Sequence, residues 1–288
     1  MPGIVIIGSG PAGVSAALYT ARAGVDTTVL TRGTGALANA ETIENYYGFA
    51  QPVSGAELER RSIEGARRLG VNFVSAEAVG LTFTDRLTVE TLTGDYPADA
   101  VILATGASRT APRLPGLAAL EGHGVSYCAV CDAFFFRGKD VAVLGSDAYA
   151  LHEAQALLPV VNRVTVLTDG AVPTVPFPPE VTVCTRKVAA VLGETTVTGV
   201  QFAEGDTLRV SGLFVALGVA GSTALARKIG AQVDGSRIVV DERMQTTVPG
   251  LYAAGDCTGG MLQVAKAVYE GALAGSEAAK AVRKGAMQ

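Results

Sequence analysis

Long basic runs and long apolar runs are both missing from this sequence. Of its 288 residues, 23 are Lys or Arg and 27 are Asp or Glu, which gives a net charge of −4. This balance argues against a nucleic acid or an anionic membrane as the main partner. No stretch reaches the roughly 20 apolar residues of a membrane span. The amino terminus lacks a basic segment with a small-residue cleavage site, so we expect a cytoplasmic protein.

Charged residues are few, at 17%, whereas hydrophobic residues make up 49% of the chain. This composition excludes a disordered chain, and the length favours two domains. Glycine is abundant, with 35 copies, and each one costs backbone entropy unless a turn or a close approach requires it. The glycine clusters therefore mark places where a ligand is expected to approach the backbone.

Histidine and cysteine are scarce, and only Cys128 and Cys131 are close in sequence. A four-coordinate zinc site needs more ligands, and the remaining candidates show no paired spacing: Cys184, Cys257, His123 and His152. A Cys-x-x-Cys pair in a reducing compartment is more often redox-active, and an inert buried pair is the other alternative. If this segment begins a helix, both sulfurs lie on one face near its positive end, which favours a reactive thiolate. The next residue, Asp132, is either a proton carrier or a helix cap.

The first glycine cluster lies between a predicted strand over 4–7 and a predicted helix over 14–23. It reads Gly8-Ser9-Gly10-Pro11-Ala12-Gly13 and fits G-x-G-x-x-G. These glycines allow a tight turn and bring a pyrophosphate close to a helix N-terminus. A strand over 27–30 completes a βαβ unit, so a dinucleotide site is favoured over a turn without a ligand.

NAD is less supported than FAD, because Leu30-Thr31-Arg32 lacks the acidic residue that usually holds an adenosine ribose. Thr31 and Arg32 are candidates for the adenosine end of FAD. Asp256, in Gly255-Asp256, is a candidate for a ribityl hydroxyl.

A second strand–turn–helix unit begins at 141–145, and its second strand is predicted over 164–167. Four prolines exclude a helix from 172–180. Other predicted features are a linker at 112–116, a boundary near residue 241, helices over 56–70 and 264–284, and strands over 71–74, 87–90 and 100–104.

Four motifs occur in order: the first glycine cluster, Ala104-Thr105-Gly106, Cys128-Ala129-Val130-Cys131-Asp132 and Gly255-Asp256. Along nearly its whole length the chain thereby resembles low-molecular-weight thioredoxin reductases. The resemblance implies an α/β protein with two Rossmann-like, three-layer ββα nucleotide-binding domains. The FAD domain would comprise residues 1–111 and 242–288, an inserted NAD(P)H-type domain with the cysteines would cover 112–241, and the protein would be a homodimer.

The resemblance also implies roles for individual residues. Cys128 would attack the disulfide of thioredoxin, Cys131 would face the flavin, and Asp132 would carry protons. Phe134, Phe135 and Arg137 match a segment that seats thioredoxin, although core phenylalanines are an equal alternative. Ala36 replaces an expected glutamine. The candidate cofactor-binding residues are Gly8, Gly10, Pro11, Ala12, Gly13, Thr31, Arg32, Gly35, Ala36, Asn45, Ala104, Thr105, Gly106, Gly255, Asp256, Gln263 and Val264.

The inserted domain departs from the family at its NADPH site. Its glycine turn reads Gly145-Ser146-Asp147, in which a carboxylate replaces the middle glycine and would repel a pyrophosphate. Thr168-Asp169-Gly170 stands where the family has cations for a 2′-phosphate, and the proline-rich stretch 172–180 replaces a helix. These three changes predict that NADPH is not the electron donor.

The sequence therefore predicts an FAD-dependent thioredoxin reductase, with ferredoxin as the expected donor, as in the pyridine-nucleotide-independent branch of the family. A ferredoxin near about −400 mV lies roughly 130 mV below thioredoxin, which is about 6 kcal/mol for two electrons. A docking patch at Arg60, Arg61, Arg67 and Arg68 is less favoured than a solvated helix face. The alternatives are an atypical NADPH-dependent reductase, a dithiol oxidase that passes electrons to oxygen, and a redox sensor.

Overall fold

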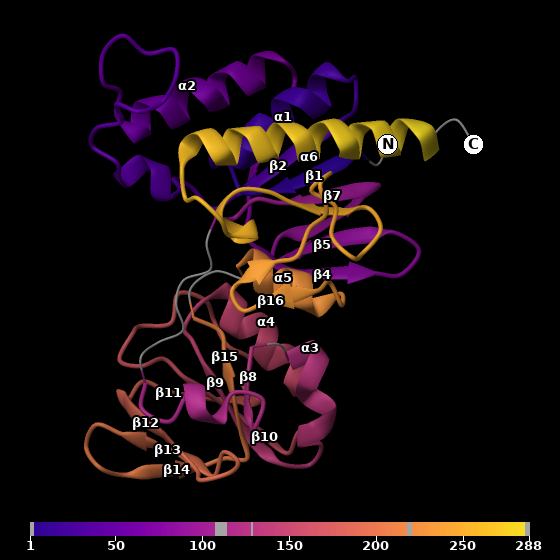
Figure 1. The fold of residues 1–288 in the computed structure, drawn as a ribbon. Helices are drawn as coiled ribbons and strands as arrows, with labels where there is room; N and C mark the ends of the chain where they lie inside the picture. The colour runs from indigo at the N-terminus through magenta and orange to yellow at the C-terminus, as the bar shows by residue number, and fades with distance from the viewer. Residues whose placement is uncertain (1–2, 107–113, 128, 218–220, 286–288) are drawn as a thin grey trace. The chain divides into compact units, whose positions relative to one another are not determined.

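The computed structural model describes residues 3–106, 114–127, 129–217 and 221–285. The chain forms two compact units (Figure 1). Unit 1 contains both ends of the chain, Met1–Ser108 and Gly221–Gln288, and unit 2 is the intervening segment Arg109–Ala220. An α/β fold with two Rossmann-like units is confirmed.

Unit 1 is built on a parallel five-stranded sheet in the order β18-β7-β1-β2-β3. Its short, apolar and β-branched segments are buried on both faces, as expected for a parallel sheet. The strands are β1 (Ile4–Ile7), β2 (Thr27–Thr31), β3 (Asn72–Ser75), β7 (Ala100–Leu103) and β18 (Leu251–Ala253).

Helices and a second sheet complete the layers of unit 1. Helices α1 (Pro11–Arg22), α2 (Gly55–Arg68) and α6 (Val264–Gly285) lie on one side of the parallel sheet (Figure 1). The antiparallel strands β4 (Ala78–Phe83), β5 (Leu87–Thr91) and β6 (Gly94–Ala98) form the other layer. Unit 1 also holds η1 (Ala36–Asn39), α5 (Ser222–Lys228), β16 (Val233–Asp234), β17 (Arg237–Ile238) and η4 (Asp256–Thr258).

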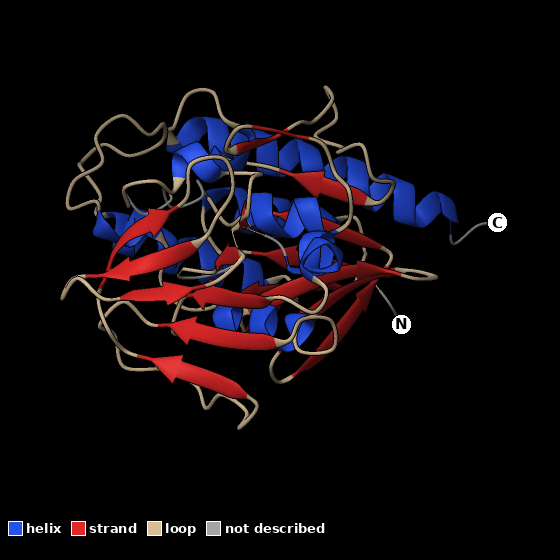
Figure 2. Cartoon of the chain, turned by 90° about the horizontal axis from the view of Figure 1, so that it is seen from below, coloured by secondary structure: helices blue, strands red, loops and turns tan. Residues whose placement is uncertain are grey.

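The first and last helices pack closely because small residues line their contact. A Cβ on Gly271 would lie 2.1 Å from the carbonyl oxygen of Ala12, and one on Gly275 would lie 2.5 Å from that of Ala16. Such distances exclude any side chain. This close packing holds α6 on α1, the helix that follows the first glycine turn. In Figure 2, α6 is the helix that ends near the C-terminus.

Unit 2 repeats the arrangement with a parallel sheet in the order β11-β10-β9-β15-β8. A small antiparallel sheet, β12-β13-β14, packs against it through an apolar core that includes Leu144, Val200 and Leu213. Its elements are η2 (Ala118–Leu120), β8 (Val125–Ser126), α3 (Ala129–Asp132), η3 (Ala133–Phe136), β9 (Asp140–Leu144), α4 (Ala148–Leu157), β10 (Arg163–Leu167), β11 (Val181–Cys184), β12 (Val188–Leu192), β13 (Gly199–Phe202), β14 (Thr207–Arg209) and β15 (Gly212–Val215).

The second domain boundary is corrected from residue 241 to residue 220, because 221–241 packs in unit 1. Two contacts show why: Ser222 Oγ lies 2.7 Å from Thr105 Oγ1, and Lys228 Nζ donates to the carbonyl of Val79 at 2.9 Å. The predicted boundary at 111/112 lies outside the described residues. Residues 172–180 contain no helix, as predicted. No described helix combines the length and apolar character that crossing a bilayer requires.

Candidate flavin and dithiol sites

The candidate flavin residues gather at one edge of the unit 1 sheet. Gly8 follows β1, Thr31 ends β2, Ala104 follows β7 and Gly255 comes shortly after β18. These four strands are neighbours and parallel, so their carboxyl ends meet at the same edge. Ligands of open α/β sheets bind at this edge.

The first glycine turn is shaped for a ligand at the start of α1. Gly8 has φ +110°, and a Cβ there would lie 2.4 Å from the carbonyl oxygen of Ala104; a Cβ on Gly13 would lie 1.8 Å from that of Gly8. Packing thus requires both glycines. A Cβ on Gly10 would meet nothing within 4 Å. The backbone is therefore open at Gly10, immediately before the helix N-terminus, where a pyrophosphate would bind.

Next to this turn lies a small hollow of about 90 Å³ that is partly open to solvent. Its lining combines apolar side chains with a few polar groups, as the linings of cofactor sites do. The lining residues are Ser9, Gly10, Pro11, Val14, Ser15, Leu18, Leu37, Tyr46, Leu58, Glu59, Ser62, Val264 and Val268. Gly10, Pro11 and Val264 were predicted from the sequence, so the donor set and the open backbone fit FAD.

Glu59 is a buried carboxylate in this lining that the sequence did not reveal. It is 5% exposed, and its Oε1 accepts a hydrogen bond from the backbone N–H of Gly35 at 3.2 Å. Gly35 and Ala36 are thereby held beside the hollow, at the start of η1. In the sequence, Glu59 is one of several charged residues on this helix and follows Leu58. The sequence alone does not distinguish its buried position from a surface position.

Two candidates far apart in sequence are brought together. Asn45 Nδ2 donates to Gln263 Oε1 at 3.0 Å, and Val264, the next residue, begins α6. The sequence placed both residues near the flavin only through the family resemblance. Their direct contact fixes the segment around Asn45 against the amino-terminal end of α6.

The two residues predicted at the adenosine end have partners within the protein. Thr31 Oγ1 lies 2.7 Å from Ser9 Oγ, which ties the end of β2 to the first glycine turn. Arg32 Nε lies 3.3 Å from a carboxylate oxygen of Glu77. The arginine side chain is thus held by an acidic residue just beyond β3.

The Ala104-Thr105-Gly106 motif is anchored by α5. Thr105 and Ser222 exchange backbone-to-hydroxyl hydrogen bonds of 3.2 Å and 2.8 Å, and Gly106 has φ +78°. Cys257 is fully buried nearby, with its Sγ 3.5 Å from the carbonyl oxygen of Leu103. Burial raises the pKa of the Cys257 thiol to about 11. This cysteine is a neutral, apolar filler at neutral pH.

The Gly255-Asp256 motif lies against the first glycine turn. Gly255 has φ +86°, and a Cβ there would come within 2.9 Å of the Cβ of Ala12. Asp256 opens η4 directly after this glycine. Two predicted cofactor motifs that lie more than 240 residues apart are therefore packed together.

In unit 2, hydrogen bonds hold the residues that flank the cysteine pair in sequence. Cys131 belongs to α3, whereas Cys128 lies outside the described residues. Tyr149 Oη donates to the carbonyl of Tyr127 at 3.0 Å, and Ser126 Oγ donates to Asp132 Oδ2 at 2.6 Å. The hydroxyl of Ser126 thus orients the predicted proton carrier.

A second missed carboxylate belongs to this segment. Glu153 on α4 is 1% exposed, and its Oε2 accepts a hydrogen bond from the N–H of Ala129, between the two cysteines in sequence. Its Oε1 lies 3.3 Å from His152 Nδ1. A carboxylate this deeply buried is tolerated only with such partners. Helix α4 therefore positions the backbone of Tyr127 and Ala129 through Tyr149 and Glu153, which are one turn apart.

The three phenylalanines after the cysteines divide into two groups. Phe134 and Phe135 are 69% and 68% exposed, and the guanidinium of Arg137 lies 5.2 Å from the ring centre of Phe134. Phe136 is buried against Phe214. The first two, together with Arg137, thus form an exposed aromatic and cationic surface next to α3, and only Phe136 is a core residue.

The second glycine turn differs from the first at its middle position. Gly145 is required by packing, because a Cβ there would lie 2.1 Å from the carbonyl oxygen of Ala216. Asp147, which corresponds to Gly10 of the first turn, is 7% exposed and stands at the start of α4. A buried acidic side chain therefore occupies the position that is open backbone in unit 1.

Two Rossmann-like units, a glycine turn with open backbone and a Cys-x-x-Cys motif that overlaps α3 are typical of flavoprotein disulfide oxidoreductases. Consistent with this class, residues 2–271 match the model of the pyridine nucleotide-disulphide oxidoreductase family. The chain is 38% identical over 306 residues to thioredoxin reductase of Aquifex aeolicus, which covers 98% of this chain and 92% of the relative. It is 31% identical to that of Bacillus subtilis, covering 94% and 92%.

Solved structures give the same result. The atypical thioredoxin reductase of Desulfovibrio vulgaris Hildenborough has 38% identity, 99% coverage of both chains and a TM-score of 0.93. A ferredoxin-flavin thioredoxin reductase of Clostridium acetobutylicum has 30% identity, 98% coverage of both chains and a TM-score of 0.73. The chain belongs to the low-molecular-weight thioredoxin reductase family, and its cofactor is FAD.

Proposed function

We propose that this chain reduces the disulfide of thioredoxin with electrons from ferredoxin and not from NADPH. The observation that carries the choice of donor is the altered nucleotide turn of unit 2, in which buried Asp147 replaces the glycine that a pyrophosphate needs. Its carboxylate would both fill the approach to the backbone and repel phosphate.

Two further features of unit 2 support this proposal. The backbone N–H of Thr174 donates to the carbonyl of Ser146 at 2.9 Å, so the proline-rich stretch is tied to the glycine turn. Asp169 stands where the family has cations, and its Oδ1 accepts the N–H of Val188 at 2.8 Å. Residues 168–180 include no Lys or Arg that could hold a 2′-phosphate.

The similarity to the Clostridium protein, whose name includes ferredoxin, also supports the donor assignment. The Desulfovibrio protein, with the higher TM-score, is named only as atypical. Neither of these two names favours an ordinary NADPH-dependent reductase over the proposed function.

The thioredoxin step is assigned to the cysteine pair. FAD, when bound, would supply a centre that takes electrons singly and passes them on as a pair. The Cys128 thiolate attacks one sulfur of the thioredoxin disulfide, forming a mixed disulfide and releasing one thioredoxin thiolate. Cys131 then attacks the Cys128 sulfur, which re-forms the intramolecular disulfide and releases the second. Asp132 supplies a proton to the leaving thiolate.

The exposed pair Phe134 and Phe135, with Arg137, is proposed as the surface that seats thioredoxin. Two large apolar rings at 69% and 68% exposure are costly on a free surface and typical of a contact area. Arg137 adds a cation beside them. We also propose that the protein is a homodimer, as in the family it resembles.

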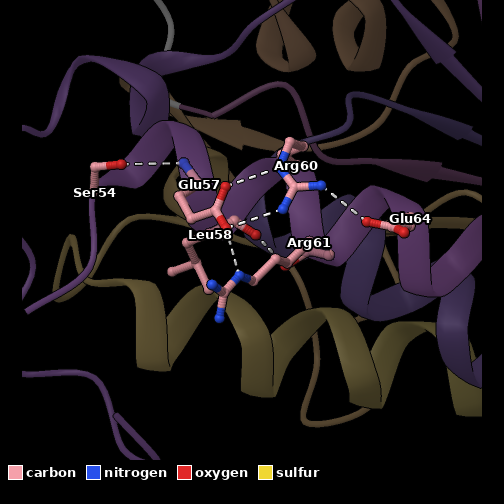
Figure 3. Close-up of polar contacts among 7 residues, drawn as sticks. Ser54, Glu57, Leu58, Arg60, Arg61 and Glu64 are labelled. Carbon is pink, nitrogen blue, oxygen red and sulfur yellow. Dashed lines mark hydrogen bonds and ion pairs between the residues drawn. The ribbon is translucent and has the colours of Figure 1, made fainter. Parts of the chain in front are cut away.

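Two of the four arginines of the expected basic patch on α2 are paired with carboxylates of the same helix. Arg60 and Arg61 both bind Glu57, at 2.8 Å and 2.6 Å, and Arg60 also binds Glu64 at 3.0 Å (Figure 3). Hydrogen bonds from the two arginines lower the pKa of Glu57 to about 2. Their charges are thus offset on the helix itself, and a solvated helix face is the better interpretation.

The test is anaerobic titration of the flavin absorbance with NADPH, NADH and reduced ferredoxin in separate experiments. We expect reduced ferredoxin to bleach the flavin fully. Neither nicotinamide nucleotide should do so at comparable rates. Fast bleaching by NADPH would contradict the donor assignment and return the chain to the NADPH-dependent reductases.

A further inference from the structure

A largely buried charge pair on α6 contacts the Gly255–Gly259 turn. The side chains of Lys266 and Glu270 are 14% and 12% exposed, and Lys266 Nζ lies 3.1 Å from Glu270 Oε2. They are four residues apart and hence on one face of the helix. Burial of two charges is costly unless their remaining hydrogen-bonding groups are also satisfied.

The ammonium of Lys266 forms hydrogen bonds with three residues of this turn. Its Nζ donates to the carbonyl of Gly255 at 2.8 Å, to Thr258 Oγ1 at 2.9 Å and to the carbonyl of Gly259. These three acceptors match the three N–H groups of an ammonium. A single cation thus joins the beginning and the end of the turn.

The carboxylate of Glu270 also forms hydrogen bonds with the turn. Its Oε2 accepts the N–H of Gly255 and the hydroxyl of Thr258, both at 2.8 Å. Gly255 is therefore held at its N–H by Glu270 and at its carbonyl by Lys266. The turn depends on left-handed backbone at Gly255 and Gly259, with φ of +86° and +79°. Asp256 lies between these two glycines, at the start of η4.

Stability alone does not explain this arrangement, because well-packed apolar side chains serve a helix interior as well as a buried ion pair does. The contacts converge on the one turn that carries Asp256. This turn packs against Ala12 of the first glycine turn. The charge pair therefore connects the shapes of two cofactor motifs.

We propose that Lys266 and Glu270 are positioning residues for FAD. They set the Gly255–Gly259 turn so that Asp256 presents its carboxylate to the cofactor. The ammonium of Lys266 also offsets the negative charge that Asp256 and Glu270 gather where a pyrophosphate binds nearby. The proposal rests on FAD occupying this edge of the unit 1 sheet.

The test compares FAD affinity of apoproteins carrying Lys266→Met, Thr258→Val or Lys280→Met. Thr258→Val removes the hydroxyl shared by Lys266 and Glu270 with little change in shape. Lys280 is the matched control, since it lies on the same helix, is 57% exposed and pairs only loosely with Glu277 at 3.6 Å. Binding is measured by the loss of FAD fluorescence on titration.

Lys266→Met is expected to raise the Kd for FAD about tenfold or more, and Thr258→Val several-fold, because each removes hydrogen bonds to a charged group. Lys280→Met should leave the Kd unchanged. The increase in Tm that FAD confers should shrink in the first two variants only. A purely structural role would instead lower the Tm of the apoprotein and preserve that increase.

The proposal is overturned if Lys266→Met and Thr258→Val apoproteins, folded by circular dichroism, bind FAD within twofold of wild type. If Lys266→Met does not fold, Thr258→Val decides alone. A folded wild-type apoprotein that takes up no FAD would overturn the placement of the cofactor, and the proposal with it. That outcome is distinct from failure of the donor assignment, which concerns unit 2.

Discussion

At the scale of single residues, buried polar groups do most of the positioning in both units. Glu59 holds Gly35 beside the hollow, and Glu153 holds Ala129 between the two cysteines. Each is a buried carboxylate that accepts a hydrogen bond from a backbone N–H. Removing Glu153 would leave the buried N–H of Ala129 unsatisfied, which costs more than the bond itself contributes.

Glu153 gives a residue-scale prediction. Glu153→Leu should lower the free energy of unfolding by about 1–3 kcal/mol, because the N–H of Ala129 would lose its acceptor. Glu153→Gln keeps an acceptor and should cost less. Thermal unfolding of both variants, with exposed Glu180→Gln as the control, measures this order. Equal effects of leucine and glutamine would contradict the positioning role.

The two cysteines outside the Cys-x-x-Cys pair should differ sharply in reactivity. In a Cys128→Ser, Cys131→Ser background, iodoacetamide at pH 8 should modify the partly exposed Cys184 and spare Cys257. Burial holds the pKa of Cys257 at about 11, so its reactive thiolate is scarce until the pH rises past that value. Mass spectrometry of the native and denatured protein gives the result. Equal labelling of both thiols in the native protein would contradict it.

At the scale of elements, the contact between α1 and α6 makes one unit from the two ends of the chain. Glycines at 271 and 275 on α6 allow backbone to approach backbone, and alanines fill the rest of the contact. The first glycine turn and the Gly255-Asp256 motif are brought together by this packing. The candidate flavin site therefore depends on the smallest residues of these helices.

A matched pair of glycine substitutions tests this element-scale account. Gly271→Ala should destabilise the protein by about 1–3 kcal/mol, because the new Cβ would lie 2.1 Å from the carbonyl oxygen of Ala12. Gly65→Ala, in α2 with nothing within 4 Å, should stabilise it by about 0.5–1 kcal/mol. Urea unfolding reports both values. A loss of stability at Gly65, or none at Gly271, would contradict the packing argument.

At the scale of the whole molecule, one architecture is used twice with different outcomes. In unit 1 the glycine turn leaves open backbone at Gly10, whereas in unit 2 the corresponding position carries buried Asp147. We propose that only unit 1 binds a dinucleotide and that unit 2 carries the cysteine pair. This difference between the two turns is the observation on which the proposed donor, ferredoxin, rests.

Local patterns predicted much of this architecture. The strand–glycine–helix units and the proline-rich stretch follow from residue types that are neighbours in sequence. The contact of Asn45 with Gln263, and the parts played by Glu59, Glu153 and Lys266, depend on packing between distant elements, which periodicity does not encode. The boundary at 241 was misplaced because α5 resembles any surface helix, and only its contacts with Thr105 and Val79 assign it to unit 1.

The most direct test of the central claim is the rate at which thiols form on thioredoxin under anaerobic conditions. Catalytic amounts of the protein are supplied with reduced ferredoxin or with NADPH, and Cys128→Ser and Cys131→Ser variants serve as controls. We predict rapid thiol formation with ferredoxin, almost none with NADPH, and loss of turnover in both variants. Equal or faster turnover with NADPH, or turnover that survives either cysteine substitution, would contradict the account.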